Sequence, residues 1–273
     1  MTEKLVAAFQ ILLNGKPLDQ PLTAAVLGLR IVDPLGAPSR CQLQLSDLDH
    51  RLGNDGPFTI GAALSIRLGH SSKLNETFSG EIVELETNLD VNEPTRAIVQ
   101  ARDRQHRLRR GTHTRTFRDV KDSDVAVQIA REQGLSADVD DSGVVHTFLL
   151  QSNRTDHAFL SARAAQCGFH LWVDGTTLFF KRPNHAADPI VRLIWGESLA
   201  RLWQEENLFG GKTSITAHGR IQGNPAVAAG TVVEIAQANP RVDGTYTVTE
   251  ATHIFDADSG YATEFSGFRS TMR

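Results

Sequence analysis

One pattern of helix, glycine and strand occurs twice in the middle of the chain, and it limits the folds open to this region. The first copy begins at Asp122-Ser123, which favours a helix start, and Gly134 follows as a left-handed stop. The second copy begins at Thr155-Asp156 and stops at Gly168. A strand pattern follows each glycine, and Asp174-Gly175 predicts a hairpin turn after the second. The sequence therefore predicts a small α+β unit here.

Outside this unit, apolar and polar residues alternate with the period of half-buried strands. In the first 110 residues this pattern covers the segments 5–13, 27–31, 41–45, 64–68 and 97–101, with a less regular one at 78–85. Beyond residue 189 it covers 190–195, 213–217, 231–235, 245–255 and 261–265. Residues 199–207 fit either a helix face or a strand. Short strands at this spacing, each with one polar face, predict antiparallel barrels or sandwiches.

The predicted fold class is α+β and mainly β, with two antiparallel, tube-like β-barrel domains bracketing a small α+β domain. The predicted domains are 1–112, 113–185 and 186–273, with the second boundary in the polar stretch 184–189. A chain of 273 residues is long enough to bury a substantial core.

Composition and local patterns argue against several functional classes. The formal net charge of -4 does not suggest a dedicated nucleic-acid binder. No apolar run approaches the roughly 20 residues of a membrane span, and the N-terminus does not resemble a secretory signal. We therefore expect no membrane partner and synthesis in a reducing cytosol, with Cys41 and Cys167 as buried free thiols.

A strip of arginines and histidines from Arg102 to Arg118 allows two interpretations. It could follow a phosphate backbone, whose binding is driven by counterion release. It could instead be solvated, or pair with carboxylates of this chain or of a neighbouring subunit. Only Phe117 lies within reach as an aromatic side chain that could stack on bases, so the second interpretation is favoured.

The sequence contains no recognised enzyme or metal-site motif. His253 with Asp256 and Asp258 resembles a metal or acid–base set, but their position at a strand end favours a local turn network. Cys167 near His170 resembles a thiol nucleophile, but its place on the apolar helix stripe favours core packing. We expect no catalytic residue, no cofactor and no metal.

The order of several short segments is more informative than any single motif. The segments are Phe78-Ser79-Gly80-Glu81-Ile82, 98–104, His106-Arg107-Leu108, 114–117, 124–134, 151–160, 165–169, 178–180, 244–248, His253 and 260–263. This succession, from about residue 75 to 270, resembles the phage late-control D proteins, which are baseplate hub proteins of contractile tails. It is also similar to the hub portion of VgrG-type spike proteins.

The resemblance implies two β-barrel tube domains around an α+β domain, assembled as a homotrimer. Three copies with two similar barrels each would form a ring that adapts a hexameric tail tube to a trimeric spike. The implied partners are the tail tube protein, other baseplate proteins and a spike on a separate chain, since no OB-fold or spike repeat follows. The implied location is a virion or tail-like particle, assembled in the bacterial cytoplasm.

The residues predicted to serve structure or assembly are Gly80, Asp103, His106, Arg107, Arg109, Arg110, Gly134, Asp156, Gly168, Gly244 and His253. Two alternatives stay open. The first is a cell-wall hydrolase at a tail tip, which requires paired carboxylates or a zinc triad in a cleft. The second is a nucleic-acid-binding protein that acts through the Arg102-to-Arg118 strip; otherwise nucleic acid is expected only as something that passes through the lumen.

Overall fold

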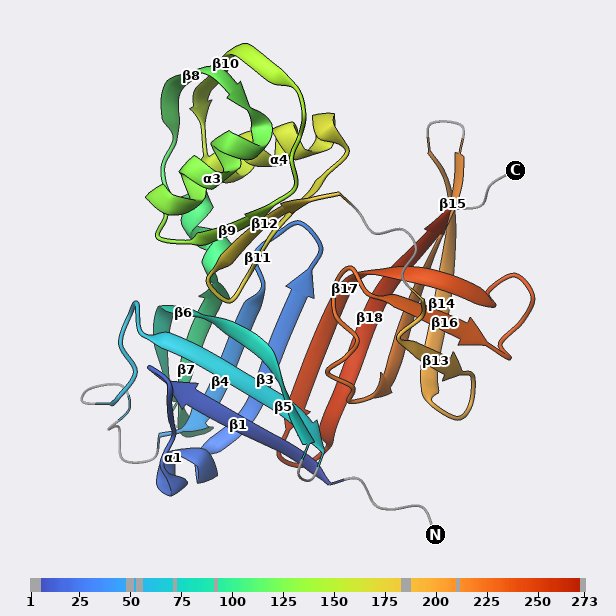
Figure 1. Ribbon diagram of the computed structural model, residues 1–273. Helices are drawn as coiled ribbons and strands as arrows, with labels where there is room; N and C mark the ends of the chain where they lie inside the picture. Colours follow the sequence, from blue (N-terminus) through green and yellow to red (C-terminus); the bar gives the residue numbers. More distant parts are fainter. Residues whose placement is uncertain are drawn as a thin grey trace. The chain divides into compact units, whose positions relative to one another are not determined.

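The computed structural model describes residues 6–47, 52, 56–70, 73–90, 93–182, 188–209 and 212–270 (Figure 1). The chain is mainly β, and most strand pairs are antiparallel. It packs as two compact units: unit 1 comprises 1–35, 39–101 and 187–273, and unit 2 comprises 36–38 and 102–186. The three predicted domains stay a prediction, and their boundary at 185–186 lies outside the described residues. No helix in the described ranges is long and apolar enough to span a membrane.

The alternating segments of the N-terminal region are strands, which confirms their prediction. The elements are β1 (Ala7–Leu13), β2 (Lys16–Pro17), α1 (Gln20–Ala24), β3 (Val26–Pro34), β4 (Arg40–Ser46), β5 (Ala63–His70), β6 (Lys73–Asp90) and β7 (Glu93–Asp103). The short helix α1 was not predicted. Asp19 caps it, since its carboxylate accepts a hydrogen bond from the Leu22 amide at 2.9 Å.

The C-terminal region is also built of strands. They are β13 (Val191–Ile194), β14 (Leu199–Phe209), β15 (Lys212–Gln222), β16 (Val232–Ala236), β17 (Gly244–Asp256) and β18 (Gly260–Ser270). The ambiguous segment 199–207 is therefore a strand, because residues 199–209 pair with β15 along their whole length.

Both regions contribute to a single 13-stranded sheet in unit 1. Its order is β14-β15-β18-β17-β3-β4-β7-β6-β5-β1-β2, with β16 paired to β17 and β13 paired to β16. The antiparallel β3–β17 pair joins the two regions, with a register that runs from Gly28 opposite Asp256 to Pro34 opposite Glu250. Figure 1 shows β3 beside β17. Among the described strands the order is open, and β14 and β2 are its ends.

One face of this sheet carries both apolar cores of unit 1. Leu29 and Ile31 on β3 belong to the first core, and Ala251 on β17 belongs to the second. The register places Ile31 opposite His253 and Leu29 opposite Phe255, and directly opposed residues point to the same face. Ala251 lies two residues before His253 on β17, so it points to this face as well. The opposite face is polar, and we call it the outer face.

Unit 2 consists of η1 (Arg104–Arg109), β8 (His113–Lys121), α3 (Asp122–Glu132), β9 (Ser136–Val139), β10 (Val145–Arg154), α4 (Asp156–Cys167), β11 (His170–Asp174) and β12 (Thr177–Lys181). The repeated helix–strand pattern is confirmed, and a further strand, β8 or β10, precedes each helix. These two strands pair with each other, and β12 lies between β11 and β9. The hairpin turn is Gly175-Thr176, one residue later than predicted, because Asp174 pairs with Thr177.

The helix ends of unit 2 follow the sequence closely. Thr155 caps α4, since its hydroxyl accepts a hydrogen bond from the Ala158 amide at 3.1 Å, and Gly168 ends it with a φ of +68°. Gly134 also has a φ of +68°. The helix α3 begins at Asp122, as predicted; Lys121 is its capping position, and the Lys121 amide donates to the Asp124 carboxylate at 3.0 Å.

The two copies of the pattern hold each other through exchanged ion pairs. Asp122, the first residue of α3, accepts hydrogen bonds from Arg163 of α4. Asp156, the first residue of α4, accepts a hydrogen bond from Arg115 of β8 at 2.7 Å. Both carboxylates are at most 2% exposed. Because a buried charge is costly without a partner, each pair links the two copies firmly.

Replacing Gly168 with valine should lower the free energy of unfolding by about 1–2 kcal/mol, because a β-branched residue is strained at this φ. A Cβ at this position would meet no heavy atom within 4 Å, so backbone strain is the only expected cost. Urea unfolding measures the change. Gly168→Asn is the matched control, because asparagine tolerates the left-handed conformation; equal losses in both variants would contradict the assignment.

Replacing Arg115 with methionine should cost about 3 kcal/mol, because it removes the guanidinium group that binds the buried Asp156 carboxylate at 2.7 Å. The control is Arg118→Met on the same strand, where the side chain is exposed. Urea unfolding of both variants checks the expectation. A loss no larger in Arg115→Met than in Arg118→Met would show that the buried pair contributes little.

Candidate assembly surface

The structure does not gather the predicted assembly residues at one site. Gly80 lies in β6 opposite Leu64, and Gly244 and His253 lie in β17. Gly134, Asp156 and Gly168 lie at helix ends of unit 2. Asp103, His106, Arg107, Arg109 and Arg110 lie in or beside η1.

The residues around η1 form a local network that fixes this turn. The Asp103 carboxylate accepts from the Gln105 amide at 2.9 Å, and His106 Nδ1 donates to the Asp103 carbonyl at 2.6 Å. His106 Nε2 then accepts from Arg110 at 2.7 Å. Arg107 donates to the Gln133 carbonyl at 3.0 Å, so it provides a hydrogen bond to a backbone carbonyl at the C-terminal end of α3.

The basic strip is thus divided among separate structural contacts. Besides Arg107 and Arg110, Arg104 donates to the Gly175 carbonyl at 3.0 Å, and Arg115 binds Asp156. These guanidinium groups bind carbonyls, carboxylates and an imidazole nitrogen of unit 2. Their geometry gives no specific support to a phosphate-binding strip.

His253 is a buried structural residue. It is 1% exposed, and its Nδ1 is hydrogen-bonded to the Tyr261 hydroxyl at 2.8 Å and to the Thr263 hydroxyl at 3.2 Å. Asp256 instead accepts hydrogen bonds from the amides of Asp258 and Ser259. The predicted turn network therefore exists, but His253 is not part of it.

The backbone conformation at Gly244 favours glycine. Its φ is +145°, and a Cβ there would lie 2.2 Å from Nη1 of Arg269. Arg269 donates to the carbonyls of Asp243 and Arg241, so the glycine leaves room for an arginine that holds this turn.

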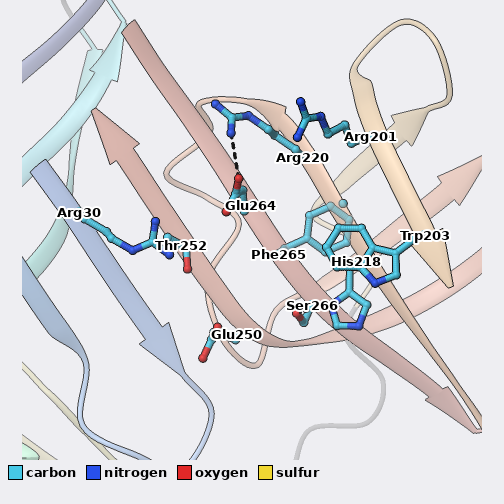
Figure 2. A pocket seen from close by; sticks show the side chains of 11 residues that line it. Arg30, Arg201, Trp203, His218, Arg220, Glu250, Thr252, Glu264, Phe265 and Ser266 are labelled. Carbon is cyan, nitrogen blue, oxygen red and sulfur yellow. Dashed lines mark hydrogen bonds and ion pairs between the residues drawn. The ribbon is translucent and has the colours of Figure 1, made fainter. Parts of the chain in front are cut away.

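The sequence reading missed the most distinctive surface, which lies on the outer face beside β14 (Figure 2). The strand registers place Arg201 of β14 directly opposite Arg220 of β15, and Arg220 opposite Glu264 of β18. Arg220 forms an ion pair with Glu264 at 2.9 Å, drawn as the dashed line in Figure 2. Two residues along β14, Trp203 stacks on His218 with a centroid distance of 4.5 Å.

A shallow groove of about 330 Å³ runs over these side chains. Arg30, Arg201 and Arg220 line it together with Glu250 and Glu264. Small-molecule pockets are mostly apolar, whereas this groove is lined largely by charged and polar side chains. The described residues contain no group of three or more His, Cys, Asp or Glu side chains that could hold a metal ion.

In the described part of unit 1, β14 and part of β6 have strand edges without a strand partner. The outer edge of β14 has no strand partner in the described part of the chain, and its Trp203 is 57% exposed. The second edge belongs to β6: β5 pairs with it only as far as Ala63 opposite Glu81. From residue 83 to 90, β6 thus has a described neighbour on one side only, β7. Unpaired edges of this length favour the addition of another strand.

A signal for this surface was present in the sequence. Read as a strand, residues 199–207 place Arg201, Trp203 and Glu205 on one face. The helical spacing of Leu199, Leu202 and Trp203 obscured it, and only the pairing with β15 decides between the two readings.

The burial of His253 makes stability depend on pH. Burial lowers the pKa of His253 from 6.5 to about 4, so the unfolded chain binds more protons between these values. The stability that the neutral, buried His253 gives to the folded chain is therefore complete above pH 6.5. It is lost as the pH falls towards 4, by about 3 kcal/mol in total. Urea unfolding at several pH values measures this slope. His253→Gln should flatten it, and an unchanged slope would contradict the assignment.

The fold of the chain is similar to those of solved tail proteins. The 43 kDa tail protein of prophage MuSo2 from Shewanella oneidensis has a TM-score of 0.75 at 15% identity, over 96% of this chain and 98% of that one. The tail protein from Neisseria meningitidis MC58 has a TM-score of 0.75 at 12% identity, over 97% of each chain. The E. coli c3393 protein, described as a component of the type VI secretion system, has a TM-score of 0.70 at 14% identity, over 94% of this chain and 76% of that one.

At these identities the likeness establishes the fold alone, which is of the phage-tail and baseplate type. Comparison with curated protein sequences gives no match. The family described as "Alg8 N-terminal domain" matches residues 3–207. This match spans well over half of the sequence, and the chain therefore belongs to the family of the Alg8 N-terminal domain.

Proposed function

We propose that this chain is a structural, non-enzymatic hub component of a phage tail or of a related contractile injection particle. The observation that carries the proposal is the shared fold with the Shewanella oneidensis tail protein, over 96% of this chain and 98% of that one. The family description names a domain and no activity, so the proposal rests on the fold and on the surfaces of unit 1.

The strand order of unit 1 supports a ring with more binding positions than subunits. Outward from the β3–β17 pair, one side runs β3-β4-β7-β6 and the other runs β17-β18-β15-β14. Each side is a pair of consecutive strands followed by a second such pair. Two similar halves in each chain allow three copies to present six comparable sheets, which suits a threefold-to-sixfold adapter.

The two free edges support ring formation by a specific physical route. The edge of β14 and the outer edge of β6 are different surfaces, so a contact between them joins one copy to the next head to tail. Such heterologous contacts form closed rings when the rotation closes. In the proposed homotrimer, the open sheets become tube-like barrels through their neighbours.

This assignment places the chain with the late-control D type of hub and the hub portion of VgrG-like proteins. Its proposed partners are a hexameric tail tube protein, a separate trimeric spike protein and other baseplate proteins. Its proposed location is the baseplate of a virion or tail-like particle, after assembly in the bacterial cytoplasm.

The purified full-length chain should form a homotrimer, three times the 29.9 kDa mass of one chain, in native mass spectrometry. Electron micrographs should show threefold rings that bind the end of a tail tube. A chain that stays monomeric at high micromolar concentration and in the presence of tube protein would overturn the proposed function.

A further inference from the structure

We infer that the groove on the outer face of unit 1 binds an extended, acidic peptide segment of a partner protein, whose carboxylates lie at Arg201 and Arg30. All residues that line this groove belong to strands of one chain, so the site exists without the proposed ring. The occupant is a polypeptide because the groove offers charges and hydrogen-bonding groups that a polypeptide satisfies better than a nucleic acid does.

Two cations of the groove are without a partner. Figure 2 shows Arg30 on one side and Arg201 with Arg220 on the other. Arg220 is engaged by Glu264 at 2.9 Å. Arg30 and Arg201 have no ion-pair or hydrogen-bond partner among the residues that the structure describes. Arg201 also lies directly opposite Arg220, where like charges are destabilising, so a carboxylate of a bound segment would offset this repulsion.

The distance between these two cations suits a short extended segment. Arg201 on β14 and Arg30 on β3 are separated by four strand spacings in the sheet order β14-β15-β18-β17-β3. Because neighbouring strands lie about 4.8 Å apart, the two backbone positions are roughly 20 Å apart across the sheet. An extended peptide of about six residues covers this distance. Its alternate side chains point to one face, so acidic residues at every second position would all point to the groove.

The groove presents hydrogen-bond donors and acceptors together. Arg30 and Arg201 donate, whereas the Glu250 carboxylate accepts and has no partner in the described part of the chain. A polypeptide backbone carries both N–H donors and carbonyl acceptors, so it can bind both kinds of group. A phosphate backbone carries negative charge throughout and would be repelled by Glu250. The groove therefore favours a polypeptide.

An ordered aromatic surface lies beside Arg201. Trp203 is 57% exposed and stacks on His218 with an interplanar angle of 9°. His218 Nδ1 is hydrogen-bonded to the Ser266 hydroxyl at 2.7 Å, which holds the ring that supports the indole. Tryptophan and arginine are enriched among the residues that contribute most of the binding energy at protein interfaces. Trp203 and Arg201 line the groove together, so the Trp203 fluorescence can report a bound peptide.

The test is the binding of a synthetic acidic peptide to the purified full-length chain. The probe alternates glutamate with serine over about eight residues, and the control peptide carries glutamine in place of glutamate. At about 50 mM salt, exposed charges are screened less than at physiological salt. Calorimetry should then show that the acidic peptide binds about fivefold tighter than the glutamine peptide. Equal affinities of the two peptides would overturn the inference.

Arg201→Gln and Arg30→Gln should each weaken binding of the acidic peptide about threefold, because each removes one exposed charge contact. The matched control is Arg131→Gln, which removes the same charge from an exposed position of α3 in unit 2. Binding should not change in this control. Full affinity in both groove variants, or an equal loss in the control, would overturn the inference.

A charge reversal gives a result that misfolding cannot imitate. The double variant Arg30→Glu with Arg201→Glu should bind a peptide that alternates lysine with serine about tenfold tighter than the wild type does, because the unpaired charges of the groove change sign. It should also lose its preference for the acidic peptide. A double variant that gains no affinity for the lysine peptide would contradict the assignment.

The class of occupant is tested with a single-stranded thymidine oligonucleotide of similar length. It should bind at least about tenfold more weakly than the acidic peptide, because its phosphates meet the groove carboxylates. Tighter binding of the oligonucleotide would overturn the choice of a polypeptide.

Fluorescence places the bound peptide. The acidic peptide should change the tryptophan emission of Trp172→Phe, whose substitution lies on β11 of unit 2, but not that of Trp203→Phe. A change that persists in Trp203→Phe would place the peptide elsewhere and overturn the inference. A chain that forms the proposed trimer but fails these peptide tests would leave the proposed hub function standing.

Discussion

The antiparallel pairing of β3 with β17 is the interaction on which unit 1 depends. It joins strands from opposite ends of the chain into one sheet and aligns the cores on one face. On the core side, Ile31 lies opposite His253, whose imidazole is buried among hydroxyl groups of β18. On the outer face, Arg30 of β3 lines the same groove as Glu250 and Thr252 of β17.

Unit 2 is stabilised by a different principle. Its two strand–helix–strand copies exchange buried ion pairs, in which a carboxylate at the start of each helix is held by an arginine of the other copy. A carboxylate at a helix N-terminus is favoured by the helix dipole, and the arginine satisfies the charge that burial would otherwise penalise. Within the basic strip, Arg104, Arg107 and Arg115 are partly buried and bind groups of this unit, whereas the other four arginines are exposed.

The geometry favours a function of shape and association. Among the residues that the structure describes, the distinctive surfaces of unit 1 are strand edges without a strand partner, the exposed Trp203 and the Arg201 side chain, which are features of protein contacts. In the proposed hub, a contact between two different surfaces of neighbouring copies would give a closed ring when its rotation closes.

The sequence by itself determined the local elements, because alternation, capping residues and helix-stop glycines act within a few residues of each other. Segments such as 41–45 and 64–68, the Thr155 cap and the Gly168 stop could be predicted for this reason. It did not decide the state of residues 199–207, whose spacing suits a helix or a strand until β15 pairs with them.

Only the tertiary structure decided which distant segments meet. No local pattern states that β3 pairs with β17, that Arg115 binds Asp156, or that Arg201 faces Arg220. These contacts arise from strand register and burial of the whole chain, where a one-residue shift would turn every side chain to the other face. The sequence therefore specified the strands and helices, and long-range pairing specified the surface that they present.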